Sequence, residues 1–237
     1  MPYNTIFLDM GYTLVFPYPS WTDVYHKAYS EAGITIDRDA LHEVLEAVWR
    51  AVIAEDATAL WDASEAGDLR RKWAIETEIL DRLGITDNRH RLVERVTQAF
   101  RSPANYRVFP EVPKTLQALR DRGYTLAIVS NWDWYLPALC RDLNLTPYFD
   151  AIITSARVGR AKPHPEIFHT ALSETSADPA RTLHVGDSYD ADVVGARVAG
   201  IAGVLVDREG TATTDGHLTI QNLDELLLLL DDFQADL

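Results

Sequence analysis

The sequence predicts an α/β protein in which an open parallel sheet carries an inserted bundle of helices. Three observations lead to this fold class. From about residue 110 onward, short apolar segments alternate with helical patterns, as in parallel sheets with right-handed crossovers. Residues 17–104 contain helical patterns and no convincing strand. Polar residues follow the apolar segments, at the strand ends where such sheets bind ligands.

The first expected strand ends in the stretch FLDMGYTLVF, at residues 7–16. Asp9 follows two apolar residues, so its carboxylate either caps a turn or is a chemical group held at the edge of the sheet. Gly11 comes two residues later, and Thr13 precedes the next apolar residues. This stretch alone leaves both interpretations of Asp9 open.

The next segment, residues 17–104, has the pattern of a small helical bundle. Amphipathic runs occupy residues 21–33, 39–55, 68–84 and 91–100. Because the bundle lies between the first strand and the second, we interpret it as a cap inserted into an α/β core. The core would comprise residues 1–16 and 105–237, and the cap residues 17–104. Proline-containing stretches at 17–19 and 103–113 are the expected hinges.

Four further apolar segments are expected to complete the sheet, because parallel strands covered on both faces are apolar along their whole length. They are TLAIVSN (125–131), AIITS (151–155), TLHVGDS (182–188) and GVLVD (203–207). Helical patterns at 113–123, 135–144, 165–174 and 190–200 separate most of them. The leucine run at 226–230 is too short to span a membrane. With Asn222 as a candidate cap and Glu225 three residues later, it predicts a buried helix.

Composition narrows the classes of partner. The 237 residues carry a net charge of −14, which disfavours contact with nucleic acid or an anionic membrane. A small anionic substrate remains compatible where a lysine or a metal reverses the local charge. The single cysteine, Cys140, excludes an internal disulfide and a thiol-rich metal site. No signal segment or membrane-spanning run is present, so we expect a cytoplasmic protein, either monomeric or homodimeric.

Four polar signatures follow the expected strands: Asp9, the pair Ser130–Asn131, Lys162 in GRAKPHPEIF, and Asp187 in GDSYDAD. Each one alone has a simple structural explanation. These explanations are a turn cap, a loop residue, a solvated lysine and acidic residues favoured at the start of a helix. Together, in this order and at successive strand ends, they indicate a functional site.

On these residues the chain resembles the haloacid dehalogenase superfamily of phosphohydrolases, in the branch with a helical cap after the first strand. FLDMGYTL resembles the first motif of that superfamily, whose usual form is Asp-x-Asp-Gly-Thr-Leu. IVSN resembles the second motif, KPHPEIF the third and HVGDSYDADVVGARVAG the fourth. The resemblance covers nearly the whole chain. It implies a Rossmann-like open parallel sheet and a cap that closes over the site.

The resemblance implies that Asp9 attacks phosphorus and forms an aspartyl phosphate, which water then hydrolyses. Mg²⁺ would lie between Asp9, the main-chain carbonyl of Gly11 and Asp187, with Asp192 supporting it. The expected substrate is a small phosphorylated metabolite.

By the same resemblance, Ser130 and main-chain N–H groups around Asn131 would bind the phosphoryl oxygens. Lys162 would neutralise the charge near the nucleophile, and Thr13 would hold the geometry of the phosphate-binding loop.

The sequence departs from the superfamily pattern at Gly11. In that pattern an aspartate two residues after the nucleophile protonates the leaving oxygen and then activates water. Here the position is Gly11, and the usual glycine is Tyr12. A main-chain metal contact survives this change, but the general acid and base does not. Such a group contributes ~10²–10⁴-fold to the rate, so we expect a phosphatase that is weakened or specialised for good leaving groups, unless another group replaces it.

Three alternatives remain. A 2-haloacid dehalogenase uses the same nucleophile without metal, but it lacks the Gly-Asp signature retained in GDSYDAD. A phosphonate hydrolase uses a cap lysine, for which Lys27 and Lys72 are available, although Lys72 in RRKW is more simply a solvated helix face. A phosphate-ligand sensor on the same fold would not need catalysis, but Asp9, Lys162 and Asp187 are all retained.

Tryptophans and histidines offer weaker signals. The tryptophans of the bundle are expected to pack in its core; they are Trp21, Trp49, Trp61 and Trp73. Trp132 and Trp134 follow Ser130 and are better placed to face the cap, where substrate contact and packing are equally compatible. No histidines have metal-ligand spacing, and His184, inside a strand, is expected to be buried with a local partner.

Overall fold

Six strands form one parallel sheet in the computed structural model, which describes residues 3–212 and 216–235. In spatial order they are β5 (Ala151–Thr154), β4 (Thr125–Ser130), β1 (Thr5–Leu8), β6 (Thr182–Gly186), β7 (Ala202–Val206) and β8 (Leu218–Ile220). The chain adds β4 and β5 on one side of β1, and then β6, β7 and β8 on the other. The direction of winding therefore switches between β1 and β6, where open α/β sheets bind their ligands.

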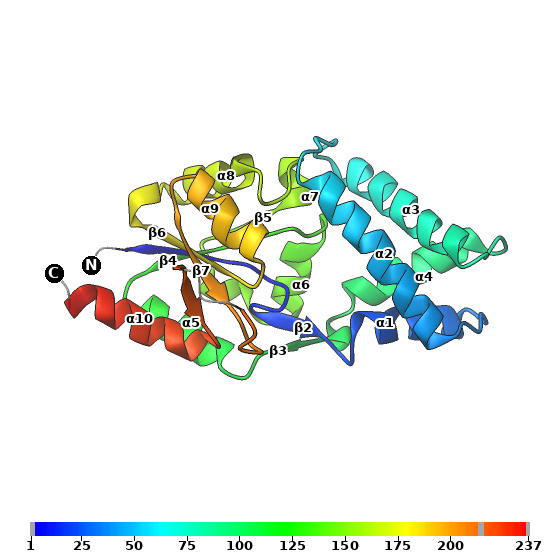
Figure 1. The fold of residues 1–237 in the computed structure, drawn as a ribbon, viewed down its shortest axis with the longest axis horizontal. Helices are drawn as coiled ribbons and strands as arrows, with labels where there is room; N and C mark the ends of the chain where they lie inside the picture. The colour runs from blue at the N-terminus through cyan, green and yellow to red at the C-terminus, as the bar shows by residue number, and fades with distance from the viewer. Residues whose placement is uncertain (1–2, 213–215, 236–237) are drawn as a thin grey trace.

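Helices cover both faces of this sheet (Figure 1). In that view α8 (Pro165–Thr175) and α9 (Gly195–Val198) lie above it, and α5 (Val112–Asp121) and α10 (Leu223–Ala235) lie below it. Two shorter helices, α6 (Leu136–Asp142) and α7 (Ser155–Val158), follow β4 and β5. This arrangement confirms the predicted α/β fold class.

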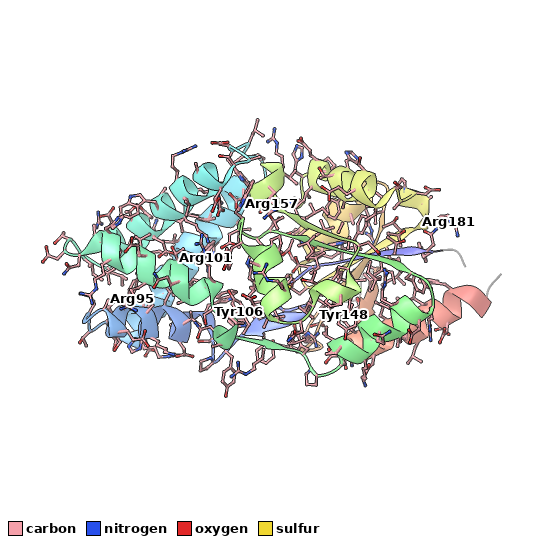
Figure 2. The ribbon with its side chains drawn as sticks, turned by 180° about the vertical axis from the view of Figure 1, so that it is seen from behind. Arg95, Arg101, Tyr106, Tyr148, Arg157 and Arg181 are labelled. Carbon is pink, nitrogen blue, oxygen red and sulfur yellow. The ribbon has the colours of Figure 1, made fainter. Side chains whose placement is uncertain are left out.

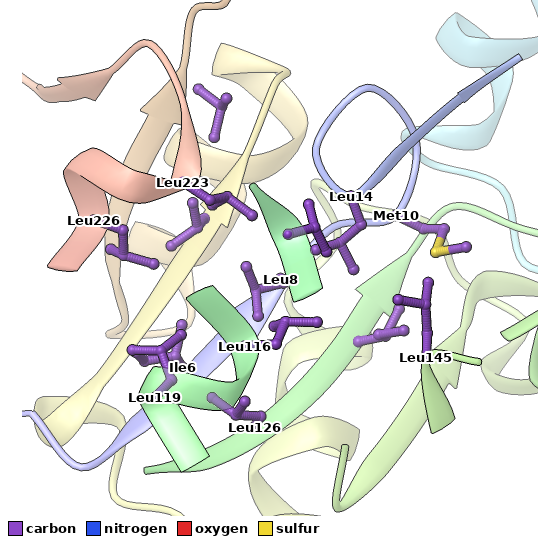
Figure 3. Packing of buried hydrophobic residues seen from close by; sticks show 14 of the residues in the cluster. Ile6, Leu8, Met10, Leu14, Leu116, Leu119, Leu126, Leu145, Leu223 and Leu226 are labelled. Carbon is purple, nitrogen blue, oxygen red and sulfur yellow. The ribbon is translucent and has the colours of Figure 1, made fainter. Parts of the chain in front are cut away.

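The first strand shows why the sheet segments are apolar throughout. Ile6 and Leu8 point to one face and join a buried cluster with Leu116 of α5 and Leu226 of α10 (Figure 3). Phe7 points to the opposite face and packs in a second cluster with side chains of α8 and α9. Because successive side chains alternate between two buried faces, the strand is apolar apart from Thr5 at its start, which is also buried.

The four amphipathic runs form the helices of a bundle at one end of the sheet (Figure 1). The helices are α1 (Trp21–Glu31), α2 (Arg38–Asp56), α3 (Glu65–Arg82) and α4 (Arg89–Arg101). They enclose a hydrophobic cluster of their own, which includes Tyr25, Leu45, Ile79 and Leu92. The division into a core of residues 1–16 and 105–237 and a cap of residues 17–104 stays a prediction.

Two short strands join the bundle to the sheet. β2 (Val15–Pro17) and β3 (Tyr106–Val108) pair in antiparallel orientation, so the chain entering the bundle and the chain leaving it run side by side. The sequence analysis missed both strands and also β8. Each has three residues, which is too short to show a period of two.

The prediction that the bundle tryptophans pack in its core is wrong. Trp49 and Trp73 are 39% and 38% exposed, and Trp21 packs against the cluster beneath the sheet. Trp61 lies under the guanidinium of Arg71. The bundle core is filled instead by tyrosines and aliphatic side chains, since the large indole is seldom completely buried.

The C-terminal helix begins where the sequence predicts. The side-chain oxygen of Asn222 accepts the Asp224 N–H at 3.0 Å, and Glu225 reaches back to the Gln221 N–H at 2.9 Å. The leucine run is buried on one face only, because Leu228 is 64% exposed. In the described part of the chain, no helix combines the length and the apolar character needed to cross a membrane.

Candidate active site

The carboxyl ends of the strands bring the four polar signatures together. Asp9 follows β1 directly, and its N–H donates to the carbonyl of Val185 in β6 at 2.9 Å. Ser130 ends β4 and Asp187 follows β6. Lys162 was expected directly after a strand, but the short helix α7 separates it from β5. Because this short helix lies between β5 and Lys162, the chain can return to the carboxyl end of β1, where Lys162 contacts Asp9.

Lys162 is the centre of the site. Its ammonium nitrogen lies 2.5 Å from Oδ1 of Asp9 and 2.6 Å from Oδ1 of Asp192, and the residue is only 4% exposed. Burial opposes the charged form, but Asp192 and Asp9 outweigh it and raise the pKa of Lys162. The lysine therefore remains an ammonium in the interior and joins two carboxylates.

Asp192 is fully occupied by hydrogen-bond donors. Its Oδ1 accepts from Lys162 and from Nε2 of His184 at 2.7 Å, and its Oδ2 accepts the Ser188 N–H at 3.0 Å. Burial disfavours its charge, but Lys162 and His184 prevail and lower the pKa of Asp192. The expected local partner of His184 is thus Asp192. With its donors in place, Asp192 is suited to positioning Lys162.

Three carboxylates converge at the site. Asp9, Asp187 and Asp192 offer oxygen atoms that all lie within 4.8 Å of one another. Burial and the charge of Asp192 raise the pKa of Asp9 despite its pairing with Lys162. The Asp187 residue is exposed, but the surrounding protein desolvates its carboxylate and, with Asp9, raises its pKa to about 8. One ammonium cannot balance three carboxylates, so a bound cation would favour their ionised forms.

The chemistry of these donors fits Mg²⁺. Asp9 and Asp187 supply carboxylate oxygens, and the Gly11 carbonyl belongs to the same loop as Asp9. A set of oxygen donors with more than one carboxylate suits a hard divalent cation. Burial and the neighbouring acidic groups raise the pKa values of Asp9 and Asp187, and a cation would favour the ionised form of both, which is a second sign of this fit.

Arg208 braces the loop after β1 and was missed by the sequence analysis. Its guanidinium donates to the carbonyls of Tyr12 at 2.9 Å and Thr13 at 2.7 Å, and it pairs with Glu111 at 2.8 Å. Tyr12 has a φ of 51°, a left-handed conformation that is uncommon outside glycine. The hydroxyl of Thr13 is buried and has no partner among the described residues. Arg208 therefore contacts the main chain of Thr13 and not its side chain.

Ser130 and Asn131, at the end of β4, link the loops that carry Asp9 and Lys162. The Ser130 hydroxyl faces the Asp9 carboxylate and favours its charged form, which lowers the pKa of Asp9 slightly against the effect of burial. The side-chain oxygen of Asn131 accepts the Lys162 N–H at 2.7 Å, and its amide nitrogen donates to the Lys162 carbonyl at 2.9 Å. The sequence analysis expected only main-chain N–H groups to act at Asn131. Its side chain also fixes the backbone that presents Lys162.

A cavity of about 460 Å³ lies beside these loops, between the bundle and the sheet. Figure 2 labels Arg101, Tyr106 and Arg157 near this junction. The prediction that Lys72 is a solvated helix face is wrong, because its ammonium pairs with Asp133 at the cavity and its side chain is largely buried. The salt bridge crosses from α3 to the loop after β4, a contact that a single helix pattern does not reveal.

The two tryptophans after Ser130 separate into different roles. Trp132 lines the cavity and faces Trp21 of the bundle, with ring centroids 6.3 Å apart. Trp134 instead packs under the guanidinium of Arg157, and its N–H donates to Asp68 of the bundle at 3.3 Å. Trp132 is therefore placed to contact a ligand in the cavity, whereas Trp134 joins the bundle to the sheet.

Comparisons with a family model and with individual known proteins agree on one family. A family model described as haloacid dehalogenase-like hydrolase matches residues 3–200. Haloacid dehalogenase-like hydrolase domain-containing protein 3 of Bos taurus is 39% identical over 115 residues, which are 48% of this chain and 46% of that protein. Phosphoserine phosphatase of Thermus thermophilus is 34% identical over 171 residues, which are 70% of this chain and 65% of that protein. The matches thus span roughly half to two thirds of these relatives.

A solved structure extends the similarity of fold to almost the whole chain. The crystal structure of the HAD-hydrolase YfnB of Bacillus subtilis, bound to magnesium, has a TM-score of 0.77 and 19% sequence identity. The superposition covers 97% of this chain and 99% of that one. At this identity the similarity establishes the fold.

Replacing Gly186 with alanine is expected to disrupt the site. A Cβ at this position would lie 2.2 Å from Cγ of Asp192, so Asp192 must move away from Lys162 and His184. We expect Gly186→Ala to lower the free energy of unfolding by about 1–3 kcal/mol, the usual cost of overpacking. Urea denaturation measures this loss. Glu174→Ala, at an exposed position of α8, is the control; equal losses in the two variants would contradict the expectation.

Proposed function

Because the chain belongs to the haloacid dehalogenase-like hydrolase family, we propose that it is a Mg²⁺-dependent phosphatase that acts through an aspartyl phosphate. Hydrolase chemistry of the phosphatase type follows from the family and from the similarity to a named phosphatase. The observation that carries the proposal is the cluster of Asp9, Asp187 and Asp192 around the buried ammonium of Lys162. The substrate is a small phosphate monoester.

In the proposed first step Asp9 is the nucleophile. Its Oδ1 is held by Lys162 at 2.5 Å, so the second carboxylate oxygen is the one that attacks phosphorus. The new bond joins this oxygen to phosphorus, and the bond from phosphorus to the leaving oxygen breaks with its electron pair. Lys162 and the Ser130 hydroxyl stabilise negative charge on the phosphoryl group. When bound by Asp9, Asp187 and the Gly11 carbonyl, Mg²⁺ supplies further electrostatic stabilisation.

In the second step water attacks the phosphorus of the aspartyl phosphate. The bond between phosphorus and the Asp9 oxygen breaks, which releases inorganic phosphate and restores the carboxylate. Asp192 and Asn131 hold Lys162 beside Asp9 through both steps, the former at its ammonium and the latter at its main chain. The site is thus set by contacts to Lys162 that need not change during turnover.

The leaving oxygen receives no proton from the position of Gly11. A Cβ built there would lie 3.5 Å from the indole ring of Trp132, so this ring occupies the space next to the absent side chain. Without a general acid, a leaving group of low basicity departs more readily than an alkoxide. We therefore propose that the enzyme favours phosphate esters with such leaving groups.

Metal-free dehalogenation is a weaker proposal for this site. In the described residues Lys162 is the lysine that pairs with this cluster, and its ion pairs are with Asp9 and Asp192, not with Asp187. In a metal-free reaction Asp187 would face the charges of Asp9 and Asp192 without an ion-pair partner of its own among the described residues. The geometry around Asp187 therefore favours cation-dependent chemistry, and a sensor without catalysis has no observation of its own to support it.

Replacing the nucleophile tests the proposal directly. Asp9→Asn keeps the shape of the side chain, so the fold should persist, while phosphate release should fall at least ~10³-fold, as for other catalytic nucleophiles. Release is measured with p-nitrophenyl phosphate and Mg²⁺, and a covalent phosphate on the acid-quenched parent protein is sought by mass spectrometry. Asp190→Asn, an exposed carboxylate within the fourth motif, is the matched control. Activity of Asp9→Asn within a few-fold of the parent would refute the assignment.

Mg²⁺ is expected to raise the melting temperature, and more strongly at alkaline pH. In the metal-free site the pKa of Asp187 is raised to about 8, so the proton there stabilises the folded state. This stabilisation is complete below the pKa of the unfolded chain and is lost as the pH rises through the folded value. Mg²⁺ competes with the same proton, so its affinity should rise by up to ~10-fold per pH unit toward pH ~8.

Thermal unfolding with and without Mg²⁺, at several pH values, measures this linkage. Mg²⁺ at a hundred times its dissociation constant stabilises the folded state by about 2.7 kcal/mol. Asp187→Asn should lose most of the effect and Asp190→Asn should keep it. A shift in melting temperature that is the same in all three proteins, at every pH, would show that Mg²⁺ binds elsewhere.

Restoring a carboxylate at Gly11 should change the dependence on the leaving group. Gly11 does not have a positive φ, and a Cβ would make an ordinary contact with Trp132, so the backbone accepts a side chain. Gly11→Asp should raise the rate with alkyl phosphates by up to ~10²-fold, and the rate with aryl phosphates less. Gly11→Asn has the same shape without the acid and is the control.

The parent protein should show rates that fall steeply as the leaving group becomes more basic. A flat dependence in the parent, together with no gain in Gly11→Asp over Gly11→Asn, would mean that another group already donates the proton. Both variants are first compared with the parent for Mg²⁺-dependent melting temperature, so that a lost metal site is recognised.

A further inference from the structure

The cavity between the bundle and the sheet has a composition that points to one class of substrate. Its aromatic residues come from both parts of the molecule and are Tyr12, Trp21, Tyr25, Trp49, Phe100, Tyr106 and Trp132. Leu45, Ile53, Ile75 and Val96 add aliphatic surface. A cavity of about 460 Å³ is within the range of small-ligand pockets, which are mostly apolar with a few placed polar groups.

The aromatic rings form a continuous wall. The centroid of Trp21 lies 5.1 Å from that of Phe100, 5.9 Å from that of Tyr106 and 6.3 Å from that of Trp132. Tyr12 lines the same cavity beside Trp21. Rings at these separations present faces and edges on which another aromatic ring packs favourably.

Charged groups around the cavity disfavour an anionic ligand. Among the described residues that line it, the basic side chains are Lys72, whose ammonium is paired with Asp133, and His42, whose Nδ1 hydrogen bonds with the Thr22 hydroxyl. Glu46 and Glu76 also line the cavity. A carboxylate or a second phosphate on the ligand would therefore meet acidic groups without a free cation to bind it.

The cavity adjoins the phosphoryl site through residues that belong to both. Tyr12 lies in the loop of Asp9, and Asn131 follows Ser130. Trp132 fills the space next to Gly11, where its ring would be 3.5 Å from an added Cβ. A phosphoryl group at Asp9 would thus have its ester oxygen near Gly11 and the remainder of the molecule against the aromatic wall.

We infer that the cavity binds the leaving group of an aryl phosphate monoester that carries no second anion. This inference rests on the proposed phosphatase function and adds the substrate class. When Asp9 bonds to phosphorus, the bond to the aryl oxygen breaks and a phenolate leaves with the electron pair, which water then protonates. A phenolate needs less help from an acid than an alkoxide, so the aromatic cavity and the glycine at position 11 select the same substrates by separate means.

Substrates whose leaving groups differ in ring size but not much in basicity distinguish binding in the cavity from an effect of leaving-group basicity alone. Phenol and 1-naphthol are similarly acidic, so 1-naphthyl phosphate and phenyl phosphate differ mainly in apolar surface. We expect kcat/KM to be about tenfold higher for the naphthyl ester, from the extra area buried. We expect 2-phosphoglycolate, which carries a carboxylate, to be a poorer substrate than either. Equal values for the two aryl esters would contradict the inference.

Two tryptophans of the bundle provide a matched pair of variants. Trp49 lines the cavity and Trp73 does not, although both are slightly more than one-third exposed. Trp49→Ala should reduce the preference for naphthyl over phenyl phosphate to about twofold or less, whereas Trp73→Ala should retain it. Ile53→Ala, at an exposed cavity position, is a second test if Trp49→Ala does not fold. Retention of the full preference in both cavity variants would overturn the inference.

A binding measurement tests the cavity independently of phosphate hydrolysis. Calorimetry with the parent protein, Mg²⁺ and 1-naphthylmethylphosphonate, compared with methylphosphonate, requires no turnover, because the carbon–phosphorus bond of a phosphonate is not hydrolysed by this mechanism. Tighter binding of the naphthyl compound, weakened by Trp49→Ala and not by Trp73→Ala, supports the cavity even if no ester is hydrolysed. Equal binding of the two phosphonates refutes the cavity while leaving phosphatase activity, tested with p-nitrophenyl phosphate, to stand or fall independently.

Discussion

The buried ammonium of Lys162, shared between Asp9 and Asp192, is the interaction on which the site depends. It joins the loop after α7 to the loop after β1 and to the π-helix η4 (Tyr189–Val194). A charge this deeply buried is costly to separate from its partners, typically by 3–5 kcal/mol when one partner is removed. The ion pairs therefore hold three segments, distant in the sequence, in one arrangement.

The surroundings of the lysine show how the fold maintains this arrangement. Gly186 leaves room for Asp192 to approach the end of β6, and Gly195 allows α9 to pack against Pro163, next to the lysine. Asn131 fixes the main chain of Lys162 from the other side. The absence of a side chain at two glycines, the close packing that it allows and the hydrogen bonds of Asn131 therefore together set the position of Lys162.

Much of the fold and part of the site could be predicted from the sequence because they depend on local patterns. The main strands are short continuous apolar runs and the four bundle helices carry clear apolar periods, and Asp9 and Asp187 directly follow strands. The partner of His184 was expected to be local, and Asp192 lies eight residues away. Features of this kind are encoded within one element or its immediate neighbours.

Other features depend on contacts between distant segments and could not be predicted. Arg208 reaches the nucleophile loop from the end of β7, almost two hundred residues later in the chain. Lys72 has the pattern of a surface residue, yet its partner Asp133 lies across the junction with the sheet. The bundle tryptophans were misassigned for the same reason, since a helical period shows which residues share a face but not what that face meets.

The antiparallel pair β2 and β3 has a mechanical consequence. Because the two connections to the bundle are hydrogen bonded to each other, they cannot bend as independent linkers, and any swing of the bundle must flex them together as one ribbon. The ribbon is anchored at its sheet end, where the Phe109 N–H donates to the Leu14 carbonyl at 3.1 Å. Leu14 directly follows the loop that Arg208 holds, so the axis of such a swing would lie next to the loop that carries Asp9. Trp21 and Phe100 of the bundle would then move relative to Trp132, which stays with the sheet.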